Sequence, residues 1–428
     1  MARLALVLLA LLVATLVAPI RGDKEVLVLV ENTNYASTHS LFFAQLSDAG
    51  YQLDVRAADD KTLRLRDWDT WIYSKLIIFA SAIHDYGGAV DSELILEFID
   101  SGHDLLIAVD SHVSDELRGL IGDLGVDVEP KGSAVRDHVG YVQSGGEVDH
   151  TVIASGEYGA IDGLFSSGPP EASTVFQGIG MSIPSDSKQV LNALGGSSTT
   201  FSALHETAIT DAPNVAAAEL ALVAAIQARN NGRVVVAGST AMFSNAFWRG
   251  PLQQHLGTKH AAPGNRELCI ALVQWVFHLR GQLWTSGLRH HRVGETQTPA
   301  HYRVSDELEV SLDIKELVGG VWQPYQATDV QVEFVMLDPY VRQTLSPTAN
   351  GTFSTTINVP DVYGVFKFVV DYARAGYSTL ELSEQVPVRP FRHNEYERFI
   401  PSAYPYYVSV LSLMAAFVLL DFLFLYRK

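Results

Sequence analysis

The hydrophobic positions follow two different periods, and the change between them lies near Trp284. Before it, short runs of branched apolar residues alternate with longer segments in which apolar residues recur every three or four positions. The short runs predict strands at Glu25–Val30, Tyr51–Arg56, Leu76–Ala80, Asp104–Val109 and Arg233–Gly238. The longer segments predict helices at Thr38–Ala49, Ser92–Ser101, Ala216–Gln227 and Glu267–Arg280. Alternation at this spacing predicts parallel strands with crossover helices, so we expect an α/β doubly wound, Rossmann-like domain.

Beyond Trp284, apolar and polar residues alternate strictly within short segments. These segments are Leu308–Ile314, Val330–Phe334 and, until its final pair, Phe366–Val370. Period-two segments separated by Gly, Pro, Asn and Asp predict an antiparallel all-β domain of the sandwich type.

Both ends of the chain are hydrophobic, but they indicate different structures. The nineteen residues from Val408 to Tyr426 would form a helix of about 28 Å, enough to cross a hydrocarbon core. Tyrosines precede this run and Arg427-Lys428 follows it, as expected for an interface and a cytoplasmic flank. The apolar stretch Leu4–Val17 is shorter and ends in small residues, which is typical of a secretory signal peptide.

These patterns predict a type I single-pass protein in six parts. They are a signal peptide at 1–22, a luminal α/β domain at 23–282, a luminal β-sandwich domain at 283–390, a juxtamembrane linker at 391–404, a transmembrane helix at 405–426 and a cytoplasmic tail at 427–428.

Composition narrows the classes of partner. The formal net charge of −18 argues against nucleic acid and anionic lipid surfaces, which attract basic patches. Cys269 is the one cysteine, so no intrachain disulfide can form. Its apolar, helix-like surroundings predict a buried, inert thiol.

No segment predicts a catalytic, cofactor or metal site. The exit of the first strand, Glu31–Thr38, has no glycine, and Gly178-Ile179-Gly180 lacks both the third glycine and a preceding strand, so a dinucleotide site is disfavoured. No Gly-x-Ser-x-Gly occurs, and the hydroxyl-rich segments 195–199 and 238–240 are interpreted as turns with capping hydroxyls. Asp67-Trp68-Asp69 resembles a cation-binding acidic pair, but so short a pattern arises easily by chance.

Three polar positions carry separate expectations. The adjacent His290 and His291 point apart on a strand, so a hydrogen-bonded cluster between the domains is favoured over a shared metal ion. Asn350-Gly351-Thr352 is the one N-glycosylation acceptor pattern, so Asn350 is a glycosylation candidate. Asp421 lies inside the predicted span; it either reaches the interface or faces another helix, and we favour helix packing.

Seven sequence blocks, taken in order, closely resemble the DDOST-type (48 kDa) subunit of the eukaryotic oligosaccharyltransferase. The blocks are Thr38–Phe43, Ala58–Asp60, Leu76–Phe79, Gln227–Asn231, His290–Thr296, Asp361–Phe366 and Tyr396–Tyr407. The resemblance implies an endoplasmic reticulum complex that transfers a preassembled oligosaccharide from dolichyl diphosphate to Asn in Asn-x-Ser/Thr. It implies an accessory, non-catalytic role beside a multi-pass catalytic subunit, the ribophorins and a small DAD-type subunit, and contact with the glycan of the lipid-linked donor is a further expectation.

The chain departs from that resemblance at its tail. Family members can carry a longer, lysine-rich cytoplasmic tail, whereas no lysines stand three and four places from Lys428. Retention in the endoplasmic reticulum is therefore expected to come from assembly rather than from a dilysine signal.

Two functions of different classes follow. The first is a scaffolding subunit whose span packs against neighbouring helices through Asp421. The alternative is a luminal glycan-binding or hydrolase-like module in which Trp68, Trp71 or Trp248 stacks on sugar. A cell-surface receptor is disfavoured, because a two-residue tail carries no signalling motif.

Overall fold

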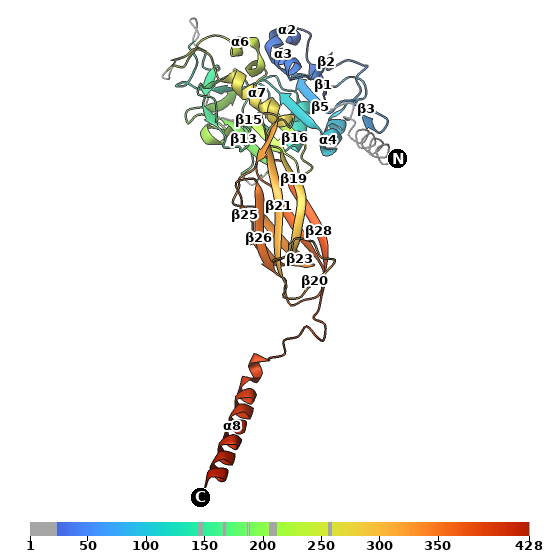
Figure 1. Ribbon diagram of the computed structural model, residues 1–428. Helices are drawn as coiled ribbons and strands as arrows, with labels where there is room; N and C mark the ends of the chain where they lie inside the picture. The colour runs from blue at the N-terminus through green and yellow to red at the C-terminus, as the bar shows by residue number, and fades with distance from the viewer. Residues whose placement is uncertain are drawn as a thin grey trace.

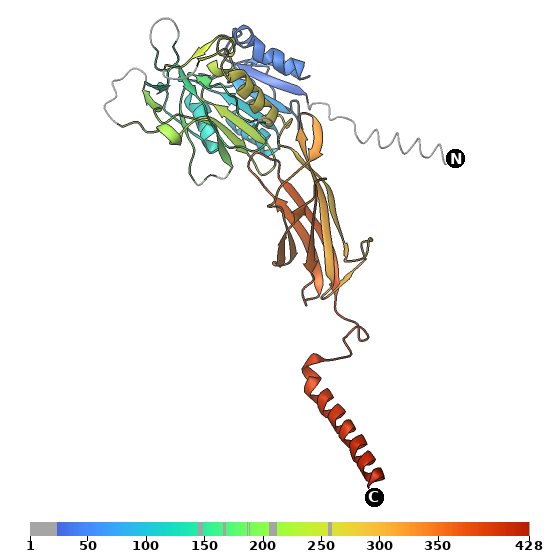
Figure 2. The same ribbon diagram turned by 60° about the vertical axis from the view of Figure 1, so that its left-hand side comes forward.

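The computed structural model describes residues 24–143, 149–165, 168–185, 187, 189–204, 212–255 and 259–427. The chain forms an N-terminal domain (β1 to α7), an elongated β domain (β19 to β28) and a C-terminal helix, α8, one after another (Figures 1 and 2). The predicted signal peptide at 1–22 lies outside the described residues.

A ten-stranded mixed sheet forms the centre of the N-terminal domain. Its path runs through β10 (Glu157–Tyr158), β13 (Val190–Gly195), β15 (Leu220–Gln227), β16 (Arg233–Ala237), β6 (Asp104–Ala108), β5 (Lys75–Phe79), β1 (Glu25–Val30) and β2 (Gln52–Ala57). The five strands from β16 to β2 are parallel, whereas β15, β13 and β10 continue the sheet antiparallel. β7 (Asp127–Val128) and β12 (Met181–Ser182) attach beside β15.

Helices cover both faces of this sheet because its strands are apolar on both sides. Along β1, Val26, Val28 and Val30 pack into the core under α3 (Ser40–Asp48) and α7 (Asn265–Val276). Leu27 and Leu29 pack into the opposite core, under α4 (Ser92–Asp100) and α5 (Asp115–Asp123). The side chains of Asp91 and Ser114 cap α4 and α5 by accepting from the amides of Leu94 and Leu117.

Short elements complete the N-terminal domain. They are α2 (Tyr35–Thr38), β3 (Arg66–Asp67), β4 (Thr70–Trp71), β8 (Ser133–Arg136), β9 (Ile153–Ser155), β11 (Thr174–Phe176), β14 (Phe201–Leu204), η1 (Ala217–Glu219), η2 (Ala241–Phe243), α6 (Asn245–Trp248), β17 (Leu252–Gln253) and β18 (Lys259–His260).

The predicted helix at Ala216–Gln227 is wrong. Only Ala217–Glu219 forms a 3-10 turn, and Leu220–Gln227 is strand β15 with seven consecutive buried residues. A strand buried on both faces has no alternation, and its alanine-rich sequence has high helix propensity; pairing with β13 and β16 overrides that propensity.

The other predicted elements of this region are present with small shifts at their ends. All five predicted strands form, as do α4 and α7, and the predicted helix at Thr38–Ala49 is divided into α2 and α3 at His39. The expected α/β sheet is present only in part, because its parallel strands make up one half of a mixed sheet.

The β domain consists of two five-stranded sheets around one core. One contains β19 (Leu283–Arg292), β21 (Glu307–Val318), β22 (Val321–Pro324), β25 (Ser346–Pro347) and β26 (Thr352–Asn358); the other contains β20 (Tyr302–Arg303), β23 (Gln331–Met336), β24 (Asp338–Thr344), β27 (Gly364–Tyr372) and β28 (Leu380–Arg389). The strict alternation sends Leu308, Val310, Leu312 and Ile314 of β21 inward, each fully buried.

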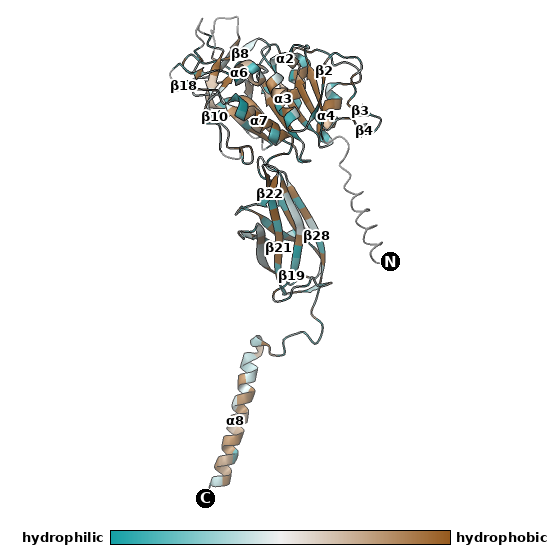
Figure 3. Ribbon diagram, turned by 45° about the horizontal axis from the view of Figure 1, so that its top comes forward, coloured by the Kyte–Doolittle hydropathy of each residue, from teal (hydrophilic) through white to brown (hydrophobic). Residues whose placement is uncertain are grey.

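Helix α8 (Tyr404–Tyr426) follows a 3-10 turn, η3 (Pro401–Ala403), and has no buried residue. Twenty-three residues give a helix of about 34 Å, and an 18-residue window within Pro401–Tyr426 has a mean hydropathy of 2.5, so the helix is long and apolar enough to cross a membrane. Most of its residues are hydrophobic (Figure 3).

Candidate functional site at the joint between the two domains

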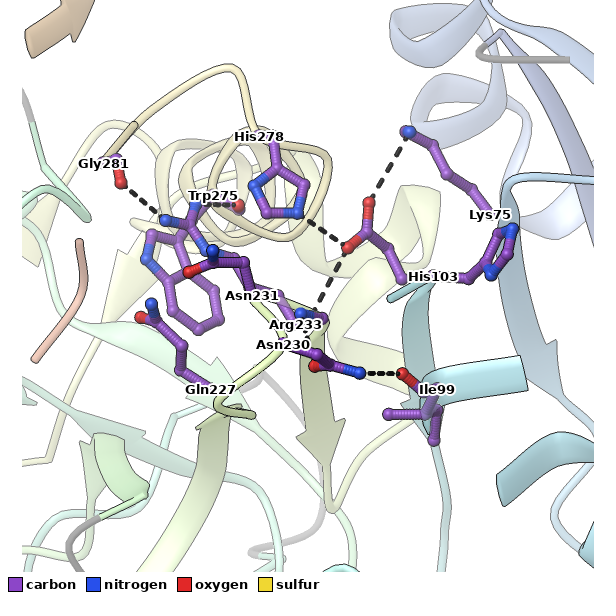
Figure 4. A network of polar contacts seen from close by, with 12 residues as sticks. Lys75, Ile99, His103, Gln227, Asn230, Asn231, Arg233, Trp275, His278 and Gly281 are labelled. Atoms are coloured by element: carbon purple, nitrogen blue, oxygen red, sulfur yellow. Dashed lines mark hydrogen bonds and ion pairs between the residues drawn. The ribbon is translucent and has the colours of Figure 1, made fainter. Parts of the chain in front are cut away.

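Three neighbouring buried strands each begin with a charged residue, so these residues lie together where the strands start. Lys75 begins β5, Asp104 begins β6 and Arg233 begins β16, and the side chain of each is almost completely buried. Because these strands are parallel and in register, the three residues lie side by side where the N-terminal domain meets the β domain (Figure 4).

Arg233 is fully buried and is held by backbone carbonyls. Its Nη1 donates to the carbonyls of Trp275 and Arg280, each at 2.7 Å, and its Nη2 donates to Gly281 at 2.6 Å and to Gly376 at 3.5 Å. The guanidinium lies over the Trp275 ring, 4.8 Å from its centroid. A planar fork of donors suits this arrangement better than an ammonium group. Burial lowers the pKa of Arg233 to about 10, so the side chain stays protonated at neutral pH.

Asp104 supplies the negative charge of this cluster. One carboxylate oxygen lies 3.0 Å from Nε2 of His278, and the other lies 3.5 Å from Nζ of Lys75. The backbone amide of Arg233 also donates to Asp104, at 3.4 Å. A buried carboxylate with these partners is electrostatically satisfied, so its observed contacts serve to fix three strands and the segment just after α7 together.

The turn between β15 and β16 binds elements on both sides of the joint. Asn230 donates to the carbonyls of Ile99 and Asp100 at the end of α4, at 2.9 and 2.8 Å. Asn231, in the left-handed conformation, accepts from the amide of Thr379 at 2.7 Å, and Gln227 donates to the carbonyl of Tyr377. This turn therefore ties the N-terminal domain to the loop that joins β27 and β28.

Two glycines allow the backbones to approach at the joint. A Cβ on Gly376 would lie 1.9 Å from the carbonyl oxygen of Asp162, and a Cβ on Gly281 would lie 2.2 Å from the carbonyl oxygen of Gly376. Both glycines have positive φ, and the carbonyl of Gly376 also accepts from the Trp275 indole at 2.8 Å. The contact between the domains is thus packed and hydrogen-bonded.

A cavity of about 520 Å³ adjoins this joint, with Lys24, Lys75, Asn231, His278 and Thr379 among its lining residues. A second cavity, of about 550 Å³, lies at the opposite edge of the sheet, where β6 and β16 end, and its polar lining includes Asp110, Lys131, Gln177 and Thr240. The carboxyl ends of parallel strands are where open α/β sheets bind ligands. Within the described ranges, no group of three or more His, Cys, Asp or Glu residues is placed to hold a metal ion.

The hydroxyl and glycine motifs have structural roles. Ser197 and Thr199 donate to the carboxylate of buried Asp137, at 2.8 and 2.9 Å. A Cβ on Gly178 would lie 1.9 Å from the carbonyl oxygen of Gly238, so this glycine permits a close approach of two backbones. The interpretation of segment 195–199 as a turn with capping hydroxyls is consistent with these contacts.

The acidic pair and the tryptophans do not form a common site. Asp67-Trp68-Asp69 lies at the turn of the β3–β4 hairpin, and Trp68 is 90% exposed there. Trp71 packs edge-on against Phe98 of α4, whereas Trp248 is buried against Phe42 of α3. The three indoles therefore offer no shared platform to a sugar.

The histidine pair lies on β19. His290 is buried, with Nδ1 2.6 Å from the Tyr302 hydroxyl and Nε2 3.2 Å from a Glu384 oxygen. Nδ1 of His291 is instead 3.1 Å from the carbonyl oxygen of Arg292. This pair lies at the end of β19 remote from the joint, where Arg292 pairs with Leu308, so the expected position between the domains is wrong.

The remaining predicted residues are single positions. Cys269 is fully buried in α7, as expected, and burial raises the pKa of its thiol. Asn350 is exposed in the turn before β26, and the hydroxyl of Thr352 donates to Asp313 at 2.7 Å. Asp421 is exposed on α8.

Sequence reasoning missed Lys75, Asp104 and Arg233, although a charged residue at the start of each apolar run was a visible signal.

Two family models match the chain: the OST48 N-terminal domain over residues 18–279 and the OST48 middle domain over residues 290–428. Proteins named the 48 kDa subunit of dolichyl-diphosphooligosaccharide–protein glycosyltransferase match nearly the whole chain. The Arabidopsis thaliana protein is 43% identical and the match covers 95% of this chain and 93% of that protein; for Danio rerio the values are 40%, 97% and 94%, and for Drosophila melanogaster they are 36%, 99% and 96%.

The fold and the joint together define the class of protein. It has a mixed-sheet domain fixed to a β domain, and its chain ends in an apolar helix long enough to span a membrane. Within that class, the family matches extend over both domains and the helix. The chain belongs to the OST48 family, and the resemblance drawn from its sequence motifs is confirmed.

Proposed function

We propose that this chain is an accessory subunit of the oligosaccharyltransferase complex in protein N-glycosylation. That complex transfers a preassembled high-mannose oligosaccharide from dolichyl diphosphate to Asn in Asn-x-Ser/Thr. The observation that carries the proposal is the match to the named 48 kDa subunits over nearly the full length of the chain.

The role is structural rather than catalytic. In support, the buried charged groups of the joint bind backbone carbonyls or one another, and the hydroxyl motif of segment 195–199 binds Asp137. A rigid joint, fixed through Arg233, suits a subunit that holds the neighbouring subunits of a complex in position. A Rossmann-like origin for the parallel half of the sheet also belongs to this proposal, since its five parallel strands have helices on both faces.

The chain is proposed to be a type I protein of the endoplasmic reticulum membrane. Residues 1–22 are its signal peptide, the domains at 23–282 and 283–390 lie in the lumen, and 391–404 lead to a span at 405–426 with the tail 427–428 in the cytosol. The apolar helix and the names of the relatives support this arrangement.

Proposed partners are the multi-pass catalytic subunit, the ribophorins and the small DAD-type subunit. Asp421 is the proposed contact in the membrane, because a carboxylate surrounded by the apolar residues of α8 is costly to expose to lipid. Hydrogen bonds between membrane helices are worth about 0.6–2 kcal/mol, which is enough to weaken one subunit contact.

The test is co-purification of the complex through this chain in mild detergent. Asp421→Leu is expected to reduce recovery of the partner subunits, whereas Asp421→Asn, which keeps hydrogen-bonding capacity, should retain most of it. Leu423→Ala, on the opposite face of α8, is the matched control. Unchanged recovery with Asp421→Leu would exclude a role for this residue, and absence of all oligosaccharyltransferase subunits from the wild-type preparation would refute the proposed function.

A further inference from the structure

Two adjacent turns at one end of the β domain expose apolar side chains. The β23–β24 turn presents Leu337, which is 98% exposed, and the start of β27 presents Tyr363, just before the strand, and Val365, at 67% and 59%. Tyr340 of β24, 45% exposed, packs edge-on against Phe366. We call Leu337, Tyr340, Tyr363 and Val365 the apolar tip.

The tip is one contiguous surface. β23 and β27 are antiparallel and Val335 pairs with Lys367, so Leu337, two residues after Val335, lies at the same end as Val365, two residues before Lys367. The two strands are so close there that a Cβ on Gly364 would lie 2.7 Å from Sδ of Met336. Leu337 also has a φ of 68°, which is a strained conformation for a leucine.

The tip faces the part of the chain that leads to α8. Gly364 pairs with Val388 of β28, and the chain leaves the β domain after Arg389, at the same end (Figure 1). The linker first folds back, because Arg389 binds both carboxylate oxygens of Glu395, at 2.6 and 2.7 Å. Only seven residues then separate Tyr396 from Tyr404, and the eight steps between these two residues reach at most about 28 Å.

The same short connection is itself amphipathic. Tyr396, Phe399 and Ile400 are each more than half exposed, and Phe399 stacks on Tyr407 of α8 with 4.8 Å between ring centroids. Aromatic residues of this kind favour the boundary between lipid and water.

We propose that the apolar tip inserts into the interfacial layer of the membrane that α8 spans, so that the β domain has two membrane contacts. The inference rests on the proposed span. The occupant is lipid, because the tip consists of separate exposed apolar side chains at the end of the β domain from which the chain continues to the helix that enters the bilayer. Asp338 and Asp361 flank the tip, so anionic headgroups add no attraction and zwitterionic lipid is sufficient.

The test uses the full chain in phosphatidylcholine nanodiscs. Because Cys269 is fully buried, a cysteine introduced at an exposed site can be labelled selectively with an environment-sensitive fluorophore. Leu337→Cys reports on the tip, Met414→Cys on the middle of α8, and Val321→Cys, 62% exposed at the other end of the β domain, is the control. Lipids that carry a nitroxide near the headgroup or in the mid-chain serve as quenchers.

The Leu337→Cys label should lose fluorescence to the headgroup quencher, and Met414→Cys to the mid-chain quencher, while Val321→Cys keeps its signal. Adding phosphatidylserine should change none of these. With the reporter at Val365→Cys, Leu337→Asp should reduce the quenching and Val321→Asp should not.

Three outcomes would overturn the inference. A label at Leu337 quenched no more than the label at Val321 would refute insertion. Protection of Leu337 only in the assembled complex would assign the tip to a protein partner. An unquenched label at Met414 would refute the span itself, which distinguishes failure of that proposal from failure of the tip contact.

Discussion

Arg233 links three segments of the chain at the joint between the domains. Its guanidinium group donates hydrogen bonds to carbonyl groups at the end of α7, in the connection to β19 and in the β27–β28 loop. Arg233→Met would keep much of the packing volume but would remove the charged donor that these carbonyls share, although each keeps a second donor from elsewhere in the joint. Hydrogen bonds to charged groups are worth about 1.5–3 kcal/mol each.

We therefore expect Arg233→Met to lower the thermal midpoint of the full chain in detergent by several degrees. Unfolding can be monitored by tryptophan fluorescence, because Trp275 lies in the joint. Arg229→Met, in the same turn but exposed, is the matched control. Equal midpoints for both variants would show that Arg233 does not stabilise the joint.

His39 gives the N-terminal domain a predictable dependence on pH. Its ring is almost fully buried, with Nε2 3.1 Å from the Thr240 carbonyl oxygen, and burial lowers its pKa. The unfolded chain then binds more protons than the folded chain, so stability is lost as pH falls through the unfolded value of about 6.5.

The measurement is the thermal midpoint between about pH 7.5 and pH 5.5, where His39→Gln should reduce the loss on acidification. Part of the slope should remain, because burial also lowers the pKa of His103. His112→Gln, at an exposed position, should leave the slope unchanged. An unchanged slope in His39→Gln would contradict the prediction.

At the scale of elements, the β27–β28 loop is the part of the β domain that enters the joint. Gly376→Ala would place a methyl group on the Asp162 carbonyl and strain a φ of +89°. Strain alone costs about 1–2 kcal/mol, so a steric clash should add to it.

Gly320→Ala separates the two effects, because Gly320 has a similar φ of +80° but open space around it. We expect Gly376→Ala to lower the thermal midpoint clearly more than Gly320→Ala does, and to increase proteolysis between the domains. Equal effects in the two variants would mean that the requirement for glycine at position 376 comes from backbone strain alone and not from the close approach of the Asp162 carbonyl.

Strand β15 shows why some elements could not be predicted. Its local sequence, rich in alanine and leucine, favours a helix. It forms a strand because it pairs with β13 and β16, and this pairing cannot be inferred from the local sequence. The β-domain strands were predictable because one face is buried and the alternation is visible. At the site, Lys75, Asp104 and Arg233 could have been suspected, but their meeting depends on strand order, which the sequence pattern does not contain.

For the whole molecule, the proposed type I arrangement places both domains on the luminal side of the membrane. Asn350 reports on it, because it is exposed in the turn between β25 and β26, and the sequence has no second acceptor pattern. If the β domain is luminal, the chain expressed in eukaryotic cells should carry one N-glycan. Treatment with an N-glycosidase should then increase its electrophoretic mobility, and Asn350→Gln should abolish that shift.

Thr352→Ser keeps the acceptor hydroxyl and the bond to Asp313, so it should keep the glycan, whereas Thr352→Ala should lose it. Absence of a glycan in the wild-type chain has two explanations, an unused acceptor or a domain in the cytosol. A second acceptor made by Val321→Asn with Gln323→Thr, on the exposed strand β22, separates them. Modification at 321 but not at 350 would leave the domain luminal, and modification at neither position would refute the type I arrangement.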